Sequence, residues 1–117
     1  MTQKASKTQI ELAKAANAFI LENMEKKVTI KQLSEHFHVS PTHMKNCFRK
    51  TYGSSIYAYT RREKMNAASD LLKNTDLTVL EIAGMCGYDN GSKFAKGFKD
   101  VTGLSPSSYR REHMMQG

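Results

Sequence analysis

The sequence predicts an all-α fold of about seven helices, arranged as two helix-turn-helix subdomains that a long linker helix joins. Apolar residues recur at spacings of three and four along most of the chain, which is typical of helices with one buried face. A unit of about fifty residues occurs twice. The order of these features places the first subdomain at 1–54, the linker helix at 55–75 and the second subdomain at 76–117.

A leading helix is expected over roughly 8–25, before the first copy of the repeat. Its apolar positions are Ile10, Ala13, Ala16, Phe19, Ile20 and Met24. This spacing gives one apolar face, which we expect to cover the first subdomain.

The repeat aligns the second half of the chain with the first. Thr29, Ile30 and Leu33 recur 49 positions later as Thr78, Val79 and Ile82, whereas Met44, Phe48 and Gly53 recur 50 positions later as Phe94, Phe98 and Gly103. Each copy therefore predicts a short helix, a turn and a second helix. The expected N-caps are Thr29, Ser40, Thr78 and Asn90, with Pro41 opening the second helix of the first copy and Gly53 and Gly103 ending the second helices.

A linker helix of about twenty residues, from Ser55 to Asn74, is predicted between the copies because no proline or glycine interrupts it. Such a helix is about 30 Å long. Ser105 and Pro106 open a last helix. Gly84 and Gly97 fall inside predicted helices, where we expect them to permit close helix packing. Tyr52, Tyr57 and Tyr59 are expected to pack on the first subdomain.

Composition excludes several classes of protein. The apolar runs are far shorter than the roughly 20 residues of a membrane span, and the polar N-terminus is unlike a secretory signal, so we expect a cytoplasmic protein. Cys47 and Cys86 form no CxxC motif and are expected to be reduced thiols. No GxSxG or HExxH motif and no catalytic triad is present, so nothing indicates an enzyme, and no cofactor is expected. His43 and Cys47 have helical i, i+4 spacing, but two ligands make a poor zinc site, so no metal is expected.

The net charge of +7 is concentrated in two segments. Residues 40–64 hold six basic residues and one acid, and residues 93–111 hold five and one. Local positive charge of this kind favours a polyanionic partner. For Arg61, Arg62 and Lys64, a solvated face of the linker and contact with phosphate are equally good interpretations.

The motif F48-R49-K50-x-x-G53 and the stretch GYDNGSKFAKGFKDVTGLSPSSYR at 87–110 resemble the DNA-binding domain of the AraC/XylS family of bacterial transcription regulators. The resemblance covers about Ile10 to Arg110. It implies a regulator, not an enzyme, that inserts two recognition helices into successive major grooves of double-stranded DNA. Because those grooves lie roughly 34 Å apart on one face of DNA, we expect a rigid linker of about 30 Å to bend the DNA.

Candidate contact residues lie on the outward stripes of the two inner helices, opposite their apolar pairs. The resemblance implies base contacts by Thr42, Lys45, Asn46, Ser92, Lys93 and Lys96, and Ala95 is suited to a thymine methyl group. Phosphate contacts are expected from Ser40, Arg49, Lys50, Asn90, Lys99 and Arg110. Gly91 removes a side chain that could read bases, so we expect the first subdomain to discriminate bases more strongly.

Two alternatives stay open at this point. A protein-interaction module could instead dock on RNA polymerase through an acidic face, whose residues would be Glu11, Glu22, Glu25 and Glu35. The chain is either a complete small regulator or a C-terminal fragment whose effector domain is absent, and the short segment before the first helix favours the fragment.

Overall fold

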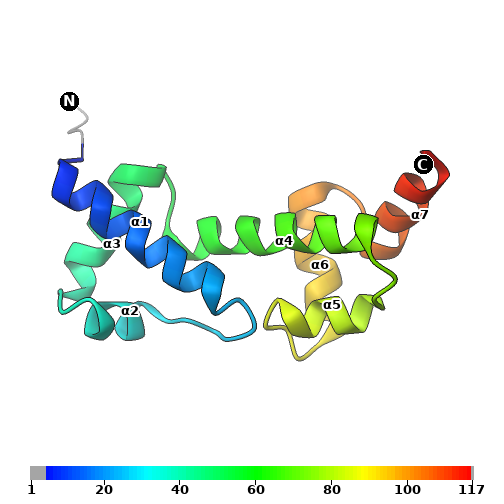
Figure 1. Ribbon diagram of the computed structural model, residues 1–117, viewed down its shortest axis with the longest axis horizontal. Coiled ribbons are helices and arrows are strands. Elements are labelled where there is room, and N and C mark those ends of the chain that lie inside the picture. The colour runs from blue at the N-terminus through cyan, green and yellow to red at the C-terminus, as the bar shows by residue number, and fades with distance from the viewer. Residues whose placement is uncertain (1–4, 117) are drawn as a thin grey trace. The chain divides into compact units, whose positions relative to one another are not determined.

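The computed structural model describes residues 5–116, and within that range the fold is all α, as predicted (Figure 1). It contains seven helices: α1 (Lys7–Glu22), α2 (Ile30–His36), α3 (Pro41–Tyr52), α4 (Ile56–Asn74), α5 (Val79–Met85), α6 (Gly91–Thr102) and α7 (Pro106–Gln116). No strand occurs among these residues. None of the helices in the described range is long and apolar enough to cross a bilayer.

The chain divides into two compact units, each with its own core. Unit 1 comprises the residues up to Asn23 together with Lys27–Thr60, and unit 2 comprises Met24–Lys26 together with everything from Arg61 onward. Helix α4 therefore gives its first residues to unit 1 and the rest to unit 2.

The short helices α2 and α5 begin with reciprocal capping boxes. The Thr29 hydroxyl accepts the Gln32 N–H at 3.1 Å, while the Gln32 side chain accepts the Thr29 N–H at 2.9 Å. Thr78 and Glu81 repeat this arrangement at the start of α5. Both capping residues are confirmed, and each box satisfies two N–H groups that a helix end otherwise leaves without partners.

The inner helices α3 and α6 also begin and end where the sequence predicts. The Ser40 hydroxyl accepts the His43 N–H at 3.1 Å, and Asn90 Oδ1 accepts two backbone N–H groups at the start of α6. Gly53 and Gly103 end these helices with φ of 75° and 88°. These values lie in the left-handed region, where glycine has no Cβ to clash.

Helix α1 is shorter than expected. It ends at Glu22 and not near residue 25, because Asn23 forms the C-cap and its side-chain amide donates to the Phe19 carbonyl at 2.8 Å. The apolar periodicity continues through Met24, but Met24 is partly buried against the core of unit 2 and does not extend the apolar face of α1.

The core of unit 1 is formed by α1, α2 and α3 with the start of α4. Its fully buried members include Ile20, Leu33, Met44 and Phe48, and Ile56 of α4 is nearly buried. The ring of Phe48 lies 4.8 Å from that of Tyr52 and 5.3 Å from that of Tyr59, so the predicted packing of these two tyrosines is confirmed. Tyr57 differs: it is 75% exposed, because it lies on the outer face of the first turn of α4.

The core of unit 2 joins α4, α5, α6 and α7. Met65 and Leu72 of α4 are buried against Ile82, Phe94 and Phe98. The ring of Tyr109 in α7 meets that of Phe98 edge-on at 5.3 Å. The two apolar pairs of the inner helices, Met44 with Phe48 and Phe94 with Phe98, are thus buried as predicted.

The two helical glycines differ in their surroundings. A Cβ on Gly97 would lie 3.0 Å from Met65 Cε, so the predicted close packing holds there. At Gly84 the prediction is wrong, since Gly84 is exposed and a Cβ would have no neighbour within 4 Å.

Candidate nucleic-acid interface

Helix α3 presents a polar ridge opposite its buried Met44 and Phe48. The predicted contact residues Thr42, Lys45, Asn46, Arg49 and Lys50 are all exposed on this one helix. The helix contains three basic residues and no acid. A cationic surface of this kind can donate hydrogen bonds to phosphate oxygens and to the acceptors of guanine.

Helix α6 presents the corresponding ridge in unit 2. Ser92, Lys93, Lys96 and Lys99 are exposed, whereas Ala95 is half-buried. Gly91 opens the helix, and a Cβ there would meet only Leu80 within 4 Å, at 3.7 Å. The first turn of α6 therefore has less side-chain surface than that of α3.

Ser40 and Asn90 are exposed caps whose side chains are already occupied by backbone N–H groups. Their contact with phosphate stays a prediction. The helix dipole still gives the N-terminal ends of α3 and α6 a partial positive charge that favours an anion.

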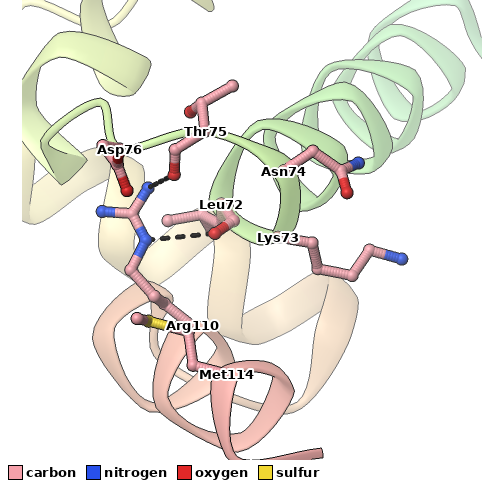
Figure 2. A pocket seen from close by; sticks show the side chains of 7 residues that line it. All are labelled: Leu72, Lys73, Asn74, Thr75, Asp76, Arg110 and Met114. Atoms are coloured by element: carbon pink, nitrogen blue, oxygen red, sulfur yellow. Dashed lines mark hydrogen bonds between the residues drawn. The ribbon is translucent and has the colours of Figure 1, made fainter. Parts of the chain in front are cut away.

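Arg110 has a structural environment that the sequence did not predict. Its Nε donates to the Leu72 carbonyl at 3.1 Å and its Nη2 donates to the Thr75 carbonyl at 3.2 Å (Figure 2). Leu72 lies in the last turn of α4, where backbone acceptors lack helical partners, and Thr75 directly follows the helix. A hollow of about 370 Å³ surrounds this contact, with Asp76 and Met114 among its lining residues. Contact of Arg110 with phosphate stays a prediction, and the geometry favours a role in holding α7 to α4.

Arg61 of α4 is also engaged inside unit 2. Its Nη2 lies 2.8 Å from Asp100 Oδ2 of α6. This ion pair was missed because the two residues are 39 positions apart in the sequence.

The residues weighed as metal ligands form no metal site in the described part of the chain. His43 Nε2 lies 3.5 Å from Cys47 Sγ, but no group of three His, Cys, Asp or Glu side chains gathers there or elsewhere among the described residues. Burial raises the pKa of the Cys47 thiol, although the nearby Lys50 partly offsets this. Burial likewise raises the pKa of Cys86, with Lys64 opposing the shift. Both cysteines are free thiols.

Comparison with known proteins agrees with this arrangement. The family described as helix-turn-helix domain matches residues 33–112. The uncharacterized HTH-type transcriptional regulator YijO of Escherichia coli K12 is 32% identical over 97% of this chain and 40% of its own length. The chain thus spans less than half the length of this relative.

Two solved structures share the fold. The C-terminal domain of AraT, a response regulator from Geobacillus stearothermophilus, has a TM-score of 0.84 and 28% identity, covering 94% of this chain and 88% of that one. A probable AraC family transcriptional regulator from Rhodopseudomonas palustris has a TM-score of 0.74 and 26% identity, covering 88% of this chain and 97% of that one.

Two helix-turn-helix units, each with an exposed basic inner helix, define the DNA-binding domain of a transcription regulator. The chain belongs to the AraC/XylS family of these regulators.

Proposed function

We propose that the chain recognises one specific duplex site as a monomer, with α3 and α6 as recognition helices in successive major grooves. Residues 1–54 and 76–117 each supply one of these helices, and 55–75 links them. The observation that carries the proposal is the repeated ridge, in which exposed polar and basic side chains lie opposite a buried apolar pair on both α3 and α6.

Base recognition is proposed for side chains in the first two turns of each helix. Lys45 and Lys96 can donate to guanine O6 and N7, and Asn46 can form two hydrogen bonds with adenine. Thr42, Ser92 and Lys93 are further candidates for direct contacts. The methyl group of Ala95 can meet a thymine methyl group, and its partial burial restricts it to such close apolar contact.

Phosphate contacts are proposed for the ends of the two ridges. Arg49 and Lys50 lie in the last turn of α3, and Lys99 lies in the last turn of α6. Such contacts fix the register of the protein on DNA without reading its sequence.

The role of the whole protein follows from this domain. We infer a cytoplasmic regulator. Binding of an effector and contact with RNA polymerase would then involve other surfaces of this domain or other parts of a longer protein. A docking module without DNA binding is not favoured, because it gives no reason for basic residues to be exposed on both repeated inner helices.

Salt titration tests the proposal directly. Affinity for a labelled duplex, measured by fluorescence anisotropy, should fall steeply with salt, with about 0.9 unit of log–log slope for each phosphate contact. Selection from a random duplex pool should then return one site of about two helical turns. Binding that does not depend on salt, or a pool that yields no preferred sequence, would contradict the proposal.

A further inference from the structure

We propose that Arg61 is a positioning residue for α6 that neutralises Asp100 and thereby keeps the ridge of α6 cationic. This role is distinct from phosphate contact, which was an equally good interpretation of Arg61 from the sequence. The inference rests on the proposed DNA binding by α6.

The geometry directs the guanidinium towards α6. Arg61 Nη2 lies 2.8 Å from Asp100 Oδ2 and 3.5 Å from the Gly97 carbonyl oxygen. The Arg61 side chain is 28% exposed and the Asp100 side chain 52% exposed. Arg61 is therefore the less accessible partner, and its charged end contacts the carboxylate of Asp100 rather than pointing away from the helix.

Gly97 makes room for this contact. A Cβ at Gly97 would come within 3.6 Å of Arg61 Nε and 3.5 Å of the Tyr88 hydroxyl, as well as 3.0 Å from Met65 Cε. Without that Cβ, α4 and its arginine can approach the backbone of α6 closely. The same glycine thus permits both the helix packing and the approach to the carboxylate.

Charge explains why a neutralising partner is needed. Asp100 is the one acid in α6, and it directly follows Lys99 and lies one turn after Lys96. At the equivalent position of α3, 50 residues earlier, the chain has Lys50. An unneutralised carboxylate so close to the two lysines would repel DNA phosphates and weaken the positive potential of the ridge. Arg61 cancels that charge from the neighbouring helix.

The two roles predict different behaviour of a double variant. If Arg61 only balances Asp100, removing both charges leaves the DNA-facing potential of α6 nearly unchanged. If Arg61 contacts a phosphate, removing Asp100 cannot restore the lost contact.

The experiment compares Arg61→Met, Asp100→Asn and the double variant on the duplex selected from the random pool. Arg61→Met should weaken binding roughly two- to fivefold, the size of an exposed charge interaction. The double variant should bind more tightly than Arg61→Met and nearly as tightly as the unmodified protein, and its salt slope should equal that of the unmodified protein. Lys99→Met is the matched control for a phosphate contact. It should lower the slope by about 0.9 whether or not Asp100 is replaced.

Three results would overturn the role of Arg61. They are a double variant whose slope is as low as that of Lys99→Met, a double variant that binds as weakly as Arg61→Met, and an Arg61→Met variant with unchanged affinity. Thermal melting verifies that each variant is folded at the assay temperature, and Arg61→Gln replaces Arg61→Met if the latter is unfolded. Failure of the unmodified protein to bind duplex would instead contradict the proposed function itself.

Discussion

His38 and Gly87 hold equivalent places in the turns of the two helix-turn-helix units, 49 positions apart, but only one of them is glycine. His38 has φ of 56° and Gly87 has φ of 82°. The residues that follow make matching hydrogen bonds, from the Val39 N–H to the Ser34 carbonyl and from the Tyr88 N–H to the Ala83 carbonyl. The turn therefore requires a left-handed residue in both units, and His38 adopts this conformation at a steric cost.

Substitutions at this position should have opposite effects in the two turns. His38→Gly should raise the free energy of unfolding by about 0.5–1 kcal/mol, because glycine relieves the steric cost. Gly87→Ala should lower it by about 2 kcal/mol, because the new Cβ would lie 2.9 Å from the Met24 carbonyl oxygen as well as requiring positive φ. Urea denaturation followed by circular dichroism measures both.

Gly84→Ala is the control for the second turn. Gly84 is exposed inside α5 and an added Cβ would lie in open space, so alanine should stabilise the helix by up to about 1 kcal/mol. A similar loss of stability in Gly84→Ala and Gly87→Ala would show that the backbone argument is wrong.

Arg110 provides a second test with two separable readouts. Arg110→Met should lower the free energy of unfolding by about 1–3 kcal/mol, because the two carbonyls at the end of α4 lose a charged donor. The salt slope of DNA binding should not change. Arg111→Met, an exposed neighbour, should leave stability within about 0.5 kcal/mol. A slope lowered by about 0.9 in Arg110→Met would instead support the predicted phosphate contact.

Helices α3 and α6 should differ in how strongly they read bases. Asn46→Ala should reduce the preference for its base pair about fivefold or more, since a bidentate contact contributes about 1–3 kcal/mol of discrimination. Lys96→Ala should reduce specificity less, because Gly91 leaves α6 with fewer side chains in its first turn. Selection with each variant on randomised duplexes measures the change at every base. A larger loss of specificity in Lys96→Ala would contradict this ranking.

The helices were predictable because the signals for them are local. Caps such as Thr29 and Ser40, the left-handed glycines that end α3 and α6, and the buried apolar pairs all depend on residues within one or two turns of each other. The same spacing placed the exposed ridges, so most of the candidate interface followed from the sequence.

The missed features depend on contacts between residues far apart in the chain. Arg61 meets Asp100 and Arg110 meets the end of α4 across 35 to 39 positions. Gly84 and Gly97 look alike in a helical pattern, and only the packing of Met65 against one of them separates their roles. Tyr57 was misassigned because helical spacing alone does not say where the core of unit 1 ends on α4.

The presence of two DNA-binding units predicts that tight binding requires a minimum length of duplex. A duplex of about two turns that carries the selected site should bind about 100-fold more tightly than either half alone, because the second unit then binds within the same complex. Anisotropy titrations with the full duplex and with each half measure the ratio. Equal affinity for the full duplex and one half would mean that only one unit binds.

Bending of the DNA stays a further expectation for the full site. The 19 residues of α4 correspond to about 28 Å of helix, less than the roughly 34 Å between successive grooves. A circular-permutation mobility assay should therefore report a bend. Straight DNA with both halves bound would contradict it.

The sharing of α4 limits how the protein can be dissected. Ile56 belongs to the core of unit 1 and Met65 to the core of unit 2, while Met24 reaches the second core from before the first repeat. A first half that ends before α4 loses Ile56 from its core. A cut within α4 divides the helix itself. A fragment of the second half that begins after Lys26 lacks Met24, and the core surface that Met24 covers becomes exposed. Excised halves should accordingly be prone to aggregate, and mutating single ridges in the intact chain is the sounder way to separate their contributions.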